Sequence, residues 1–294
     1  MLFVMKVRII QVPYDSGHRS VRMGAGPEHF VQNGVARILQ TDGHSVQVES
    51  VESKSAFPTE IKVAFELCRQ LAERVRAARE QGSFPLVLSG NCNSSLGTLA
   101  GLGSQEEGLG MVWFDAHGDF NTPETRESSF LDGMGMATAT DHCWTKLAAT
   151  IPGFVPLPDS HVLHVGGRDF DPEEGTLLER SRICVVVAER IRRVGMREAL
   201  APALESLSAR AESVYLHLDM DVLDPATTPA NEYGVRVPDG LSVAQVEEAV
   251  RMIGERFLIG AACVASYDPK YDESNRTFEA GVRLMKSILA AGHR

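Results

Sequence analysis

Two short acidic motifs carry the residues of this chain that could do chemistry. The first is an Asp-x-His-x-Asp triplet formed by Asp115, His117 and Asp119, and the second is an Asp-x-Asp pair, Asp219 and Asp221. Neither motif contains a Lys or an Arg. Carboxylates that are packed together repel one another and resist burial in their charged form. Bound divalent cations would compensate that charge, so the two motifs together predict a metal site.

The number and kind of these ligands favour two ions. A single catalytic ion typically takes about three protein ligands, whereas the motifs offer four carboxylates and one imidazole. Two ions that share carboxylates and a water fit the set better, and oxygen ligands favour Mn²⁺, Mg²⁺ or Co²⁺. The alternative is that Asp115 and Asp119 only cap a turn or a helix. The second motif of the same kind favours the metal site.

The elements that must position these motifs alternate along the whole chain. Short β-branched runs contain adjacent apolar residues, which is typical of parallel strands covered on both faces. The strands predicted in this way are 6–12, 45–51, 85–89, 110–115, 161–166, 182–187, 213–219 and 257–265. Helices are predicted over 59–81, 196–209 and 275–291, and another begins after Ser242, with Gln245 completing a capping box. We therefore predict one α/β domain, residues 1–294, built on a predominantly parallel sheet of about eight strands.

Five of the predicted strands run directly into polar sequence. In an open parallel sheet, ligands bind outside the carboxyl ends of the strands. The polar segments should therefore meet along one edge of the sheet, which is the main functional signal in the sequence. They are Ser89–Asn93, Asp115–Asp119, Gly167–Asp171, Asp219–Asp221 and Ser266–Pro269.

Composition limits the class of protein. The chain has 294 residues and a net charge of −10, without a block of basic residues, which argues against a nucleic-acid partner. Its five cysteines are widely spaced and form no Cys-x-x-Cys pair, which argues against a disulfide framework; Cys143, Cys184 and Cys263 are predicted to be buried. The sequence has no recognisable signal peptide and no apolar run near the roughly 18 residues that cross a bilayer. We expect a soluble, cytoplasmic protein with no membrane partner.

The chemistry-bearing segments resemble the arginase/ureohydrolase superfamily of binuclear manganese amidinohydrolases, and the resemblance spans most of the chain. Asp115–Pro123 is similar to the family motif D-A-H-x-D-x-N-T, and Asp219–Pro225 with Thr228–Ala230 is similar to D-x-D-x-x-D-P…T-P-A. Gly24–Pro27 resembles the glycine-rich stretch before the family's first helix. The resemblance implies a three-layer arginase-like fold and two divalent cations, Mn²⁺ first among them. Asp115 and Asp219 would bridge the ions, Asp119 would bind one, and His117 and Asp221 would bind the other.

The same resemblance implies a reaction and a substrate class. The two ions would activate a shared water, and the hydroxide would attack an amidine carbon to release urea or hydroxyurea and an amine. Asp171 and Glu174 match a loop that recognises the α-amino group of arginine, and Asn121 and Ser128 match contacts to its α-carboxylate. An arginine-like amino acid is expected, unless Gly167–Glu174 is only a solvated acidic loop. Family members often form trimers or hexamers, so a homo-oligomer is implied as well.

Three positions depart from the family pattern. Cys92 replaces a metal-binding histidine; it either ligates as a softer thiolate, which favours Zn²⁺, Fe²⁺ or Co²⁺, or is an inert buried thiol. Asp132 replaces a histidine that shuttles protons, and is the candidate general acid. Ser266 replaces a glutamate that pairs with the substrate guanidinium. Losing that carboxylate suits a less basic group, such as an N-hydroxyguanidine.

These observations lead us to expect metal-dependent hydrolysis of a C–N bond in N-hydroxyarginine or arginine. One alternative is a catalytically impaired binding or regulatory protein that kept the pocket. Another is a different ureohydrolase, such as a formiminoglutamate hydrolase. The intact carboxylate motifs favour the enzyme, because a pure binding protein has little reason to concentrate so much negative charge.

Overall fold

A single parallel sheet runs through the middle of the computed structural model, which describes residues 4–55, 59–103, 108–125 and 130–292. The order of its eight strands is β4-β1-β5-β10-β9-β6-β7-β8. The strands are β1 (Lys6–Val12), β4 (Ser45–Ser50), β5 (Phe84–Ser89), β6 (Leu109–Phe114), β7 (Val162–Val165), β8 (Cys184–Val186), β9 (Ser213–Asp219) and β10 (Leu258–Ala265). Every predicted strand is present. A short hairpin of β2 (Tyr14–Asp15) and β3 (His18–Arg19), which was not predicted, lies beside the sheet.

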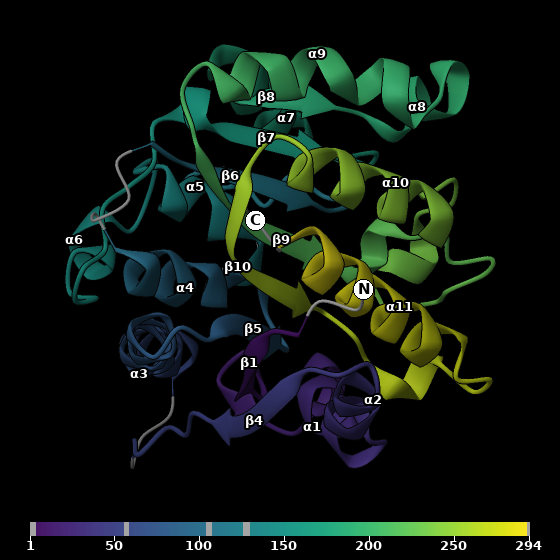
Figure 1. The fold of residues 1–294 in the computed structure, drawn as a ribbon. Coiled ribbons are helices and arrows are strands. Elements are labelled where there is room, and N and C mark those ends of the chain that lie inside the picture. The colour runs from purple at the N-terminus through teal and green to yellow at the C-terminus, as the bar shows by residue number, and fades with distance from the viewer. Residues whose placement is uncertain (1–3, 56–58, 104–107, 126–129, 293–294) are drawn as a thin grey trace.

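Helices cover both faces of the sheet and complete three layers (Figure 1). One face carries α3 (Glu60–Glu80), α4 (Ser95–Leu102), α5 (Gly135–Ala139), α6 (Thr145–Ala148) and α7 (Pro172–Arg180). The other carries α1 (Gly26–Gln32), α2 (Val35–Thr41), α8 (Ala188–Val194), α9 (Met196–Ser208), α10 (Val243–Gly254) and α11 (Arg276–Ala291). The predicted three-layer α/β architecture is confirmed.

Adjacent apolar residues in the strands account for this layering. Side chains alternate between the two faces of a strand, so Ile9 packs into the core on the α10–α11 side while Ile10 packs into the core under α3. Leu86 and Val87 of β5 divide between the two cores in the same way. Each of these strands therefore packs against both helical layers. Because both of its faces are buried, successive residues of the strand can all be apolar.

The long helices follow their sequence signals, whereas the short ones were missed. The capping box before α10 forms as predicted: the Ser242 hydroxyl accepts from the Gln245 N–H at 3.3 Å, and the Gln245 side chain accepts from the Ser242 N–H at 2.8 Å. The unpredicted α1, α2 and α8 each have seven residues. Two helical turns are too short for an apolar periodicity to stand out from loop sequence.

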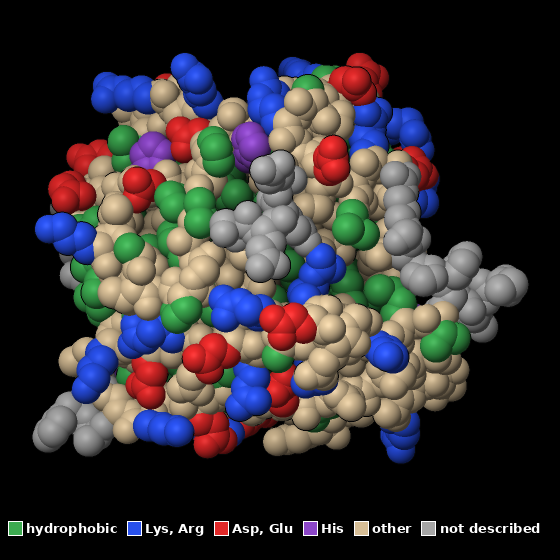
Figure 2. Space-filling model, turned by 60° about the vertical axis from the view of Figure 1, so that its left-hand side comes forward, with side chains coloured by type: hydrophobic (Ala, Val, Ile, Leu, Met, Phe, Trp, Pro, Cys, Tyr) green, Lys and Arg blue, Asp and Glu red, His purple; other side chains and the backbone are tan. Residues whose placement is uncertain are grey.

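The surface and the cysteines agree with most of the compositional expectations. Figure 2 shows acidic and basic side chains interspersed over one face of the molecule. No helix within the described ranges is both long and apolar enough to span a bilayer. All five cysteines are free thiols, and Cys143 and Cys263 are buried as predicted. Cys184 is exposed, contrary to prediction, because β8 is an edge strand with one side open.

The carboxyl ends of five neighbouring strands lie side by side. Ser89 is level with Ala265, and Ala265 with Asp219. Phe114 is level with Leu218 on one side and with Val165 on the other. The polar segments that follow these strands therefore meet at one edge of the sheet, as the sequence predicts.

Candidate metal centre

The two acidic motifs converge through turns rather than through strand pleating. Strand β6 ends at Phe114, so the Asp-x-His-x-Asp triplet is not extended, and Asp119 has a left-handed φ of 46°. Asp219 is the last residue of β9, and Asp221 lies in the 3₁₀ turn that follows. The prediction that these groups meet is confirmed, and turns rather than an extended strand bring the groups of the first motif together. Left-handed backbone is strained for a residue with a side chain, and such strain gathers at functional sites.

Backbone donors orient the carboxylates of both motifs. The His117 N–H donates to Asp115 Oδ1 at 2.7 Å, and the Asp221 N–H donates to Asp219 Oδ1 at 2.8 Å. The indole of Trp113 donates to Asp115 Oδ2 at 2.9 Å. Because these donors are rigid parts of strands and turns, the carboxylates are held in place before any ligand arrives.

Potential ligand atoms fall into three overlapping groups, and within each group the atoms lie no more than 4.8 Å apart. The groups are Asp115, His117 and Asp221; Cys92, Asp115 and Asp119; and Cys92, His217 and Asp219. All six predicted metal ligands are therefore brought together. His217 was not predicted. A signal that could have found it is an imidazole inside a buried strand, two positions before Asp219.

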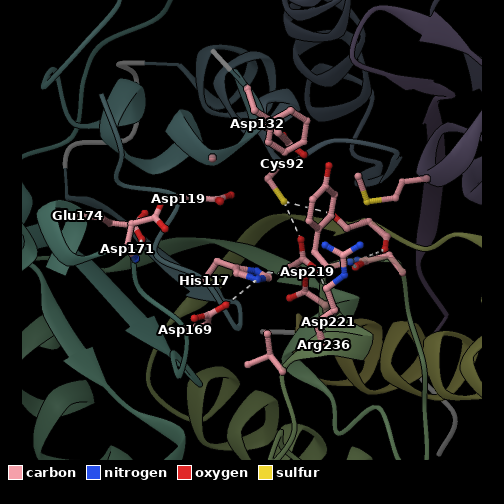
Figure 3. A pocket seen from close by; sticks show the side chains of 17 residues that line it. Cys92, His117, Asp119, Asp132, Asp169, Asp171, Glu174, Asp219, Asp221 and Arg236 are labelled. Carbon is pink, nitrogen blue, oxygen red and sulfur yellow. Dashed lines mark hydrogen bonds and ion pairs between the residues drawn. The ribbon is translucent and has the colours of Figure 1, made fainter. Parts of the chain in front are cut away.

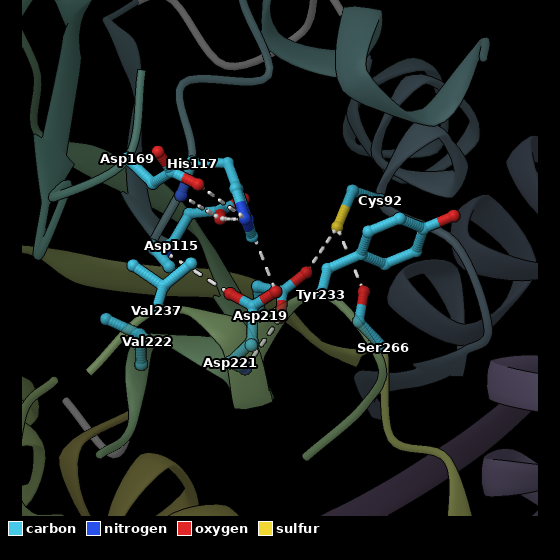
Figure 4. Close-up of polar contacts among 12 residues, drawn as sticks. Cys92, Asp115, His117, Asp169, Asp219, Asp221, Val222, Tyr233, Val237 and Ser266 are labelled. Carbon is cyan, nitrogen blue, oxygen red and sulfur yellow. Dashed lines mark hydrogen bonds and ion pairs between the residues drawn. The ribbon is translucent and has the colours of Figure 1, made fainter. Parts of the chain in front are cut away.

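Figure 4 shows how Cys92, which begins the 3₁₀ turn after β5, faces the acidic motifs. Its Sγ lies 2.9 Å from Asp219 Oδ2 and 3.3 Å from the Ser266 hydroxyl. Burial, together with the nearby Asp219, raises the pKa of the Cys92 thiol well above its usual value. The thiol is therefore protonated and donates to Asp219. A cation bound here would displace that proton, as thiolate ligation requires.

The electrostatics of the cluster fit a cation. Burial and repulsion from neighbouring carboxylates raise the pKa of Asp119 and of Asp219 well above the usual value. Burial alone would lower the pKa of His117, but the charges of Asp221 and Asp115 outweigh it and raise that pKa. Without a bound cation, these carboxylates and the imidazole therefore hold protons that reduce the net negative charge of the cluster. Divalent cations supply that charge directly, so this donor set suits them.

A cavity of about 200 Å³ opens over these groups (Figure 3). Cys92, His117, Asp119, Asp219 and Asp221 form part of its lining. Other lining residues are Asp132, Asp169, Asp171, Glu174, Tyr233, Arg236 and Ser266. The predicted residues Asp132, Asp171, Glu174 and Ser266 thus share one cavity with the metal ligands. Ser128 lies outside the described residues.

The acidic segment after β7 begins helix α7. Asp171 is its N-cap, and Glu174 completes a capping box in which Glu174 Oε2 accepts from the Asp171 N–H at 3.2 Å. Glu174 Oε1 also accepts from the Phe120 N–H at 2.9 Å, and the Asn121 amide donates to Asp171 Oδ2 at 3.0 Å. Glu174 is 3% exposed. Glu174 is thus tied to the first acidic motif and is not part of a solvated loop, whereas Asp169, Asp171 and Glu173 are exposed.

We predict that Glu174 makes the stability of the metal-free protein depend on pH. Burial raises its pKa from 4.5 to about 7, so between these values the folded chain holds a proton that the unfolded chain has released. The free energy of unfolding then falls as pH rises through this window, by on the order of 2–3 kcal/mol for this group. Urea unfolding of wild type and Glu174→Gln at pH 4.5 to 7.5 measures it. The stability of wild type should fall relative to that of Glu174→Gln as pH rises, and parallel curves would contradict the assignment.

Asp132 lies on the far wall of the cavity from His117. Its carboxylate accepts from the Asn91 amide at 2.7 Å and from the Asn93 N–H at 2.9 Å. Burial raises the pKa of Asp132 well above its usual value despite these donors, and the charges of Asp15 and Asp115 add to the effect. A carboxyl group in this position can hold a proton at neutral pH.

Arg168 supports the loop between β9 and α10, which supplies Tyr233 and Arg236 to the cavity wall. Its guanidinium donates to the carbonyl of Asp221 at 2.8 Å, of Val222 at 3.2 Å and of Leu223 at 3.3 Å. It also reaches the carbonyl of Val237 at 3.1 Å, on the other arm of the loop. This supporting role was not predicted, because every residue has a backbone carbonyl and the partners of Arg168 therefore cannot be recognised from residue types.

Comparison with known proteins gives one consistent result. The family model described as "Arginase family" matches residues 5–291. Arginase of Bacillus caldovelox is 31% identical over 96% of this chain and 97% of its own length, and arginase of Bacillus subtilis is 30% identical over 96% and 97%. Among solved structures, the native B. caldovelox arginase at pH 5.6 has a TM-score of 0.86 and 30% identity, covering 97% of this chain and 98% of that one.

Proposed function

We propose a function that starts from the membership of this chain in the arginase family of binuclear-metal amidinohydrolases. The chain hydrolyses a C–N bond in an arginine-like amino acid, and its preferred substrate is N-hydroxyarginine. The products are then hydroxyurea, or urea from arginine, together with an amine. The metal motifs, the cavity and the similarity to arginases support the hydrolytic reaction. The preference for the hydroxylated substrate is the finer part of the proposal.

One observation carries that finer part: two of the departures from the family pattern touch each other. Cys92 Sγ lies 3.3 Å from the Ser266 hydroxyl, and both residues line the cavity. At the position of Ser266 the family pattern has a glutamate that pairs with the guanidinium. A neutral hydroxyl gives no countercharge to a fully ionised guanidinium, but it can hydrogen-bond a less basic N-hydroxyguanidine. A residue at a metal-binding position and a residue at a substrate-binding position therefore differ from the family pattern and are in contact with each other.

The chain's own groups have distinct proposed roles. Asp115 and Asp219 would bridge two cations, with Asp119 and Cys92 on one and His117 and Asp221 on the other. Mn²⁺ is the proposed ion for the set of Asp115, His117 and Asp221, which offers two carboxylates and one imidazole. When bound, the two cations would supply a hydroxide nucleophile at neutral pH and positive charge for the developing anion.

Substrate binding is assigned to the side of the cavity formed by the start of α7. Asp171 and Glu174 would receive the α-amino group, because they are the acidic groups fixed on the α7 side of the cavity. Asn121, bonded to Asp171, and Ser128 are proposed to contact the α-carboxylate. Asp132 would hold a proton at its carboxyl group and pass it to the departing amine.

Metal content and product formation test the proposal together. Metal-free protein is incubated with Mn²⁺, desalted and analysed for bound metal, and then assayed for urea from arginine and hydroxyurea from N-hydroxyarginine. We expect about two ions per chain and a kcat/KM at least roughly tenfold higher for N-hydroxyarginine, which corresponds to about 1.4 kcal/mol of transition-state preference. Agmatine serves as the control, because it lacks the α-carboxylate.

Two results would count against this function. Equal or better turnover of arginine would remove the preference for the hydroxylated substrate while leaving the reaction type intact. Thermal stabilisation by N-hydroxyarginine without turnover of any guanidino or formimino compound would favour a binding protein, because binding to the folded state alone raises stability.

A further inference from the structure

We propose that His217 is a metal ligand, so that the ion on the Cys92 side is held by a thiolate, an imidazole and the carboxylate of Asp219. The inference rests on the proposed metal-dependent function and adds a ligand to its site. It concerns the composition of the site rather than turnover, so it can be tested whether or not the substrate assignment is correct.

The geometry begins with strand β9. His217 and Asp219 are two residues apart in a strand, so their side chains lie on the same face of the sheet. A ring nitrogen of His217, Cys92 Sγ and a carboxylate oxygen of Asp219 lie within 4.8 Å of one another. All three residues are buried, and His217 is 0% exposed. His217 thus lies buried beside the thiol and the carboxylate.

The hydrogen bonds of His217 identify the nitrogen that is available. Nδ1 lies 3.0 Å from the Ser95 hydroxyl and 3.1 Å from the Tyr215 hydroxyl. Nε2 is buried and has no hydrogen-bond partner. With its proton on Nδ1, shared with one of the hydroxyls, the ring leaves an unshared electron pair on Nε2, as a metal ligand requires.

The surroundings hold this ring in one orientation. The imidazole stacks on Trp113 with 3.8 Å between ring centroids and 26° between planes. A buried polar atom without a hydrogen-bond partner destabilises the folded chain, and a cation within reach of Nε2 would remove that cost. The stacked partner, Trp113, also donates to Asp115. Trp113 therefore holds both the His217 ring and the Asp115 carboxylate.

A second buried histidine on the same edge makes a useful comparison. His164 also has one unpartnered ring nitrogen, Nδ1. Its Nε2 lies 2.7 Å from the His117 carbonyl, and its ring belongs to none of the three potential ligand groups. His164 thus supports the backbone of the first motif, whereas His217 has an unused nitrogen and a ring that lies within ligand distance of a thiol and a carboxylate.

This ligand set predicts two chemically different ion positions. Sulfur and imidazole ligands favour Zn²⁺, Fe²⁺ or Co²⁺, whereas carboxylates favour Mn²⁺. The Cys92 side would then take a softer ion than the Asp115, His117 and Asp221 side. Binding of that ion would release the thiol proton of Cys92, and no oxidant or other reactant is needed.

Cobalt is a suitable probe because its spectra report its ligands. Metal-free protein is titrated with Co²⁺ and followed by the thiolate-to-cobalt charge-transfer absorption and by the hyperfine-shifted, solvent-exchangeable imidazole N–H resonances. We expect about two Co²⁺ per chain, a charge-transfer band that is absent in Cys92→Ser, and one N–H resonance each from His117 and His217. Neither readout requires turnover.

The principal variant is His217→Phe, which keeps a ring against Trp113 and removes both nitrogens. Ser95 and Tyr215 remain bonded to each other, with 2.8 Å between their hydroxyls. We expect one N–H resonance to disappear and the affinity for the Cys92-side ion to fall at least about a hundredfold, more than a supporting residue typically costs. The ion at Asp115, His117 and Asp221 should remain. His161→Asn, whose ring contacts the Leu109 carbonyl at the start of β6, is the control and should change nothing.

The proposal is overturned if His217→Phe binds both Co²⁺ ions with wild-type affinity and the same N–H resonances. It is also overturned if affinity falls but the resonances are unchanged, because His217 would then act only through a neighbour. Should the Phe variant fail to fold by circular dichroism, His217→Asn decides by the same two readouts. If the hydrolase assay fails but the cobalt spectra are as expected, the proposed substrate is rejected and the assignment of His217 as a metal ligand stands.

Discussion

Asp219→Asn is expected to abolish hydrolysis and to leave the protein folded. In our proposal this carboxylate is shared by both ions, so its loss should lower metal affinity and kcat/KM by more than the roughly 10–100-fold that removal of a supporting residue costs. The amide oxygen can still accept from the Asp221 N–H, which now donates to Asp219 Oδ1 at 2.8 Å. Metal analysis, steady-state kinetics with N-hydroxyarginine and urea unfolding measure the three quantities.

The stability of the metal-free variant separates ligand loss from misfolding. Burial and the charges of Asp221 and Asp115 raise the pKa of Asp219, so its ionised form is unfavourable in the folded chain without metal. A neutral amide removes that penalty, and the metal-free variant should be at least as stable as wild type at pH 8. Asp224→Asn is the matched control: this carboxylate caps the Ala226 N–H in the same segment and should not affect metal content. Full activity of Asp219→Asn would refute the assigned bridge.

Restoring the family residues at both altered positions should redirect the enzyme toward arginine. The double variant Cys92→His, Ser266→Glu places a carboxylate where a fully ionised guanidinium can pair with it. A charge-assisted hydrogen bond is worth about 1.5–3 kcal/mol, so the ratio of kcat/KM for N-hydroxyarginine over arginine should fall roughly 10- to 100-fold. Steady-state kinetics with both substrates under saturating Mn²⁺ give this ratio.

A neutral replacement of similar size isolates the role of charge. Cys92→His, Ser266→Gln fills the same space, and residue 266 keeps its left-handed φ of 63° in both variants, so backbone strain cancels in the comparison. The ratio of kcat/KM for N-hydroxyarginine over arginine should fall in the variant with Glu at position 266 and stay unchanged in the variant with Gln. If Gln shifts it equally, shape rather than charge sets the preference, and the interpretation of Ser266 is incorrect.

The fold was predictable because a buried parallel strand has a recognisable local sequence pattern, a short run of adjacent apolar residues. Runs such as Leu86-Val87-Leu88 place apolar residues on both faces of the sheet, and each such run became a strand. The polar residues that follow the strands then had to meet at one edge. Short helices were not predictable in this way: α7 depends on a capping box between Asp171 and Glu174, and the same residues also resemble a substrate-binding loop.

The site was predictable in its acidic motifs and not in what supports them. Asp115 and Asp219 stand out because a carboxylate directly after a buried strand is unusual. The proposed role of His217 depends on its closeness to Cys92, which is 125 positions away in the chain and becomes a neighbour only when β5 and β9 share a sheet. Such long-range pairs arise from topology, and no local spacing encodes them.

Arg168 has a consequence for how this protein can diversify. Its guanidinium holds the loop between β9 and α10 by carbonyl groups, and every amino acid has a carbonyl group. Side chains on that loop, such as Tyr233 and Arg236, can therefore be exchanged without loosening the loop's course. The cavity wall can change under selection for new substrates while the metal end stays fixed. A single arginine thus separates the part of the site that can evolve quickly from the part that cannot.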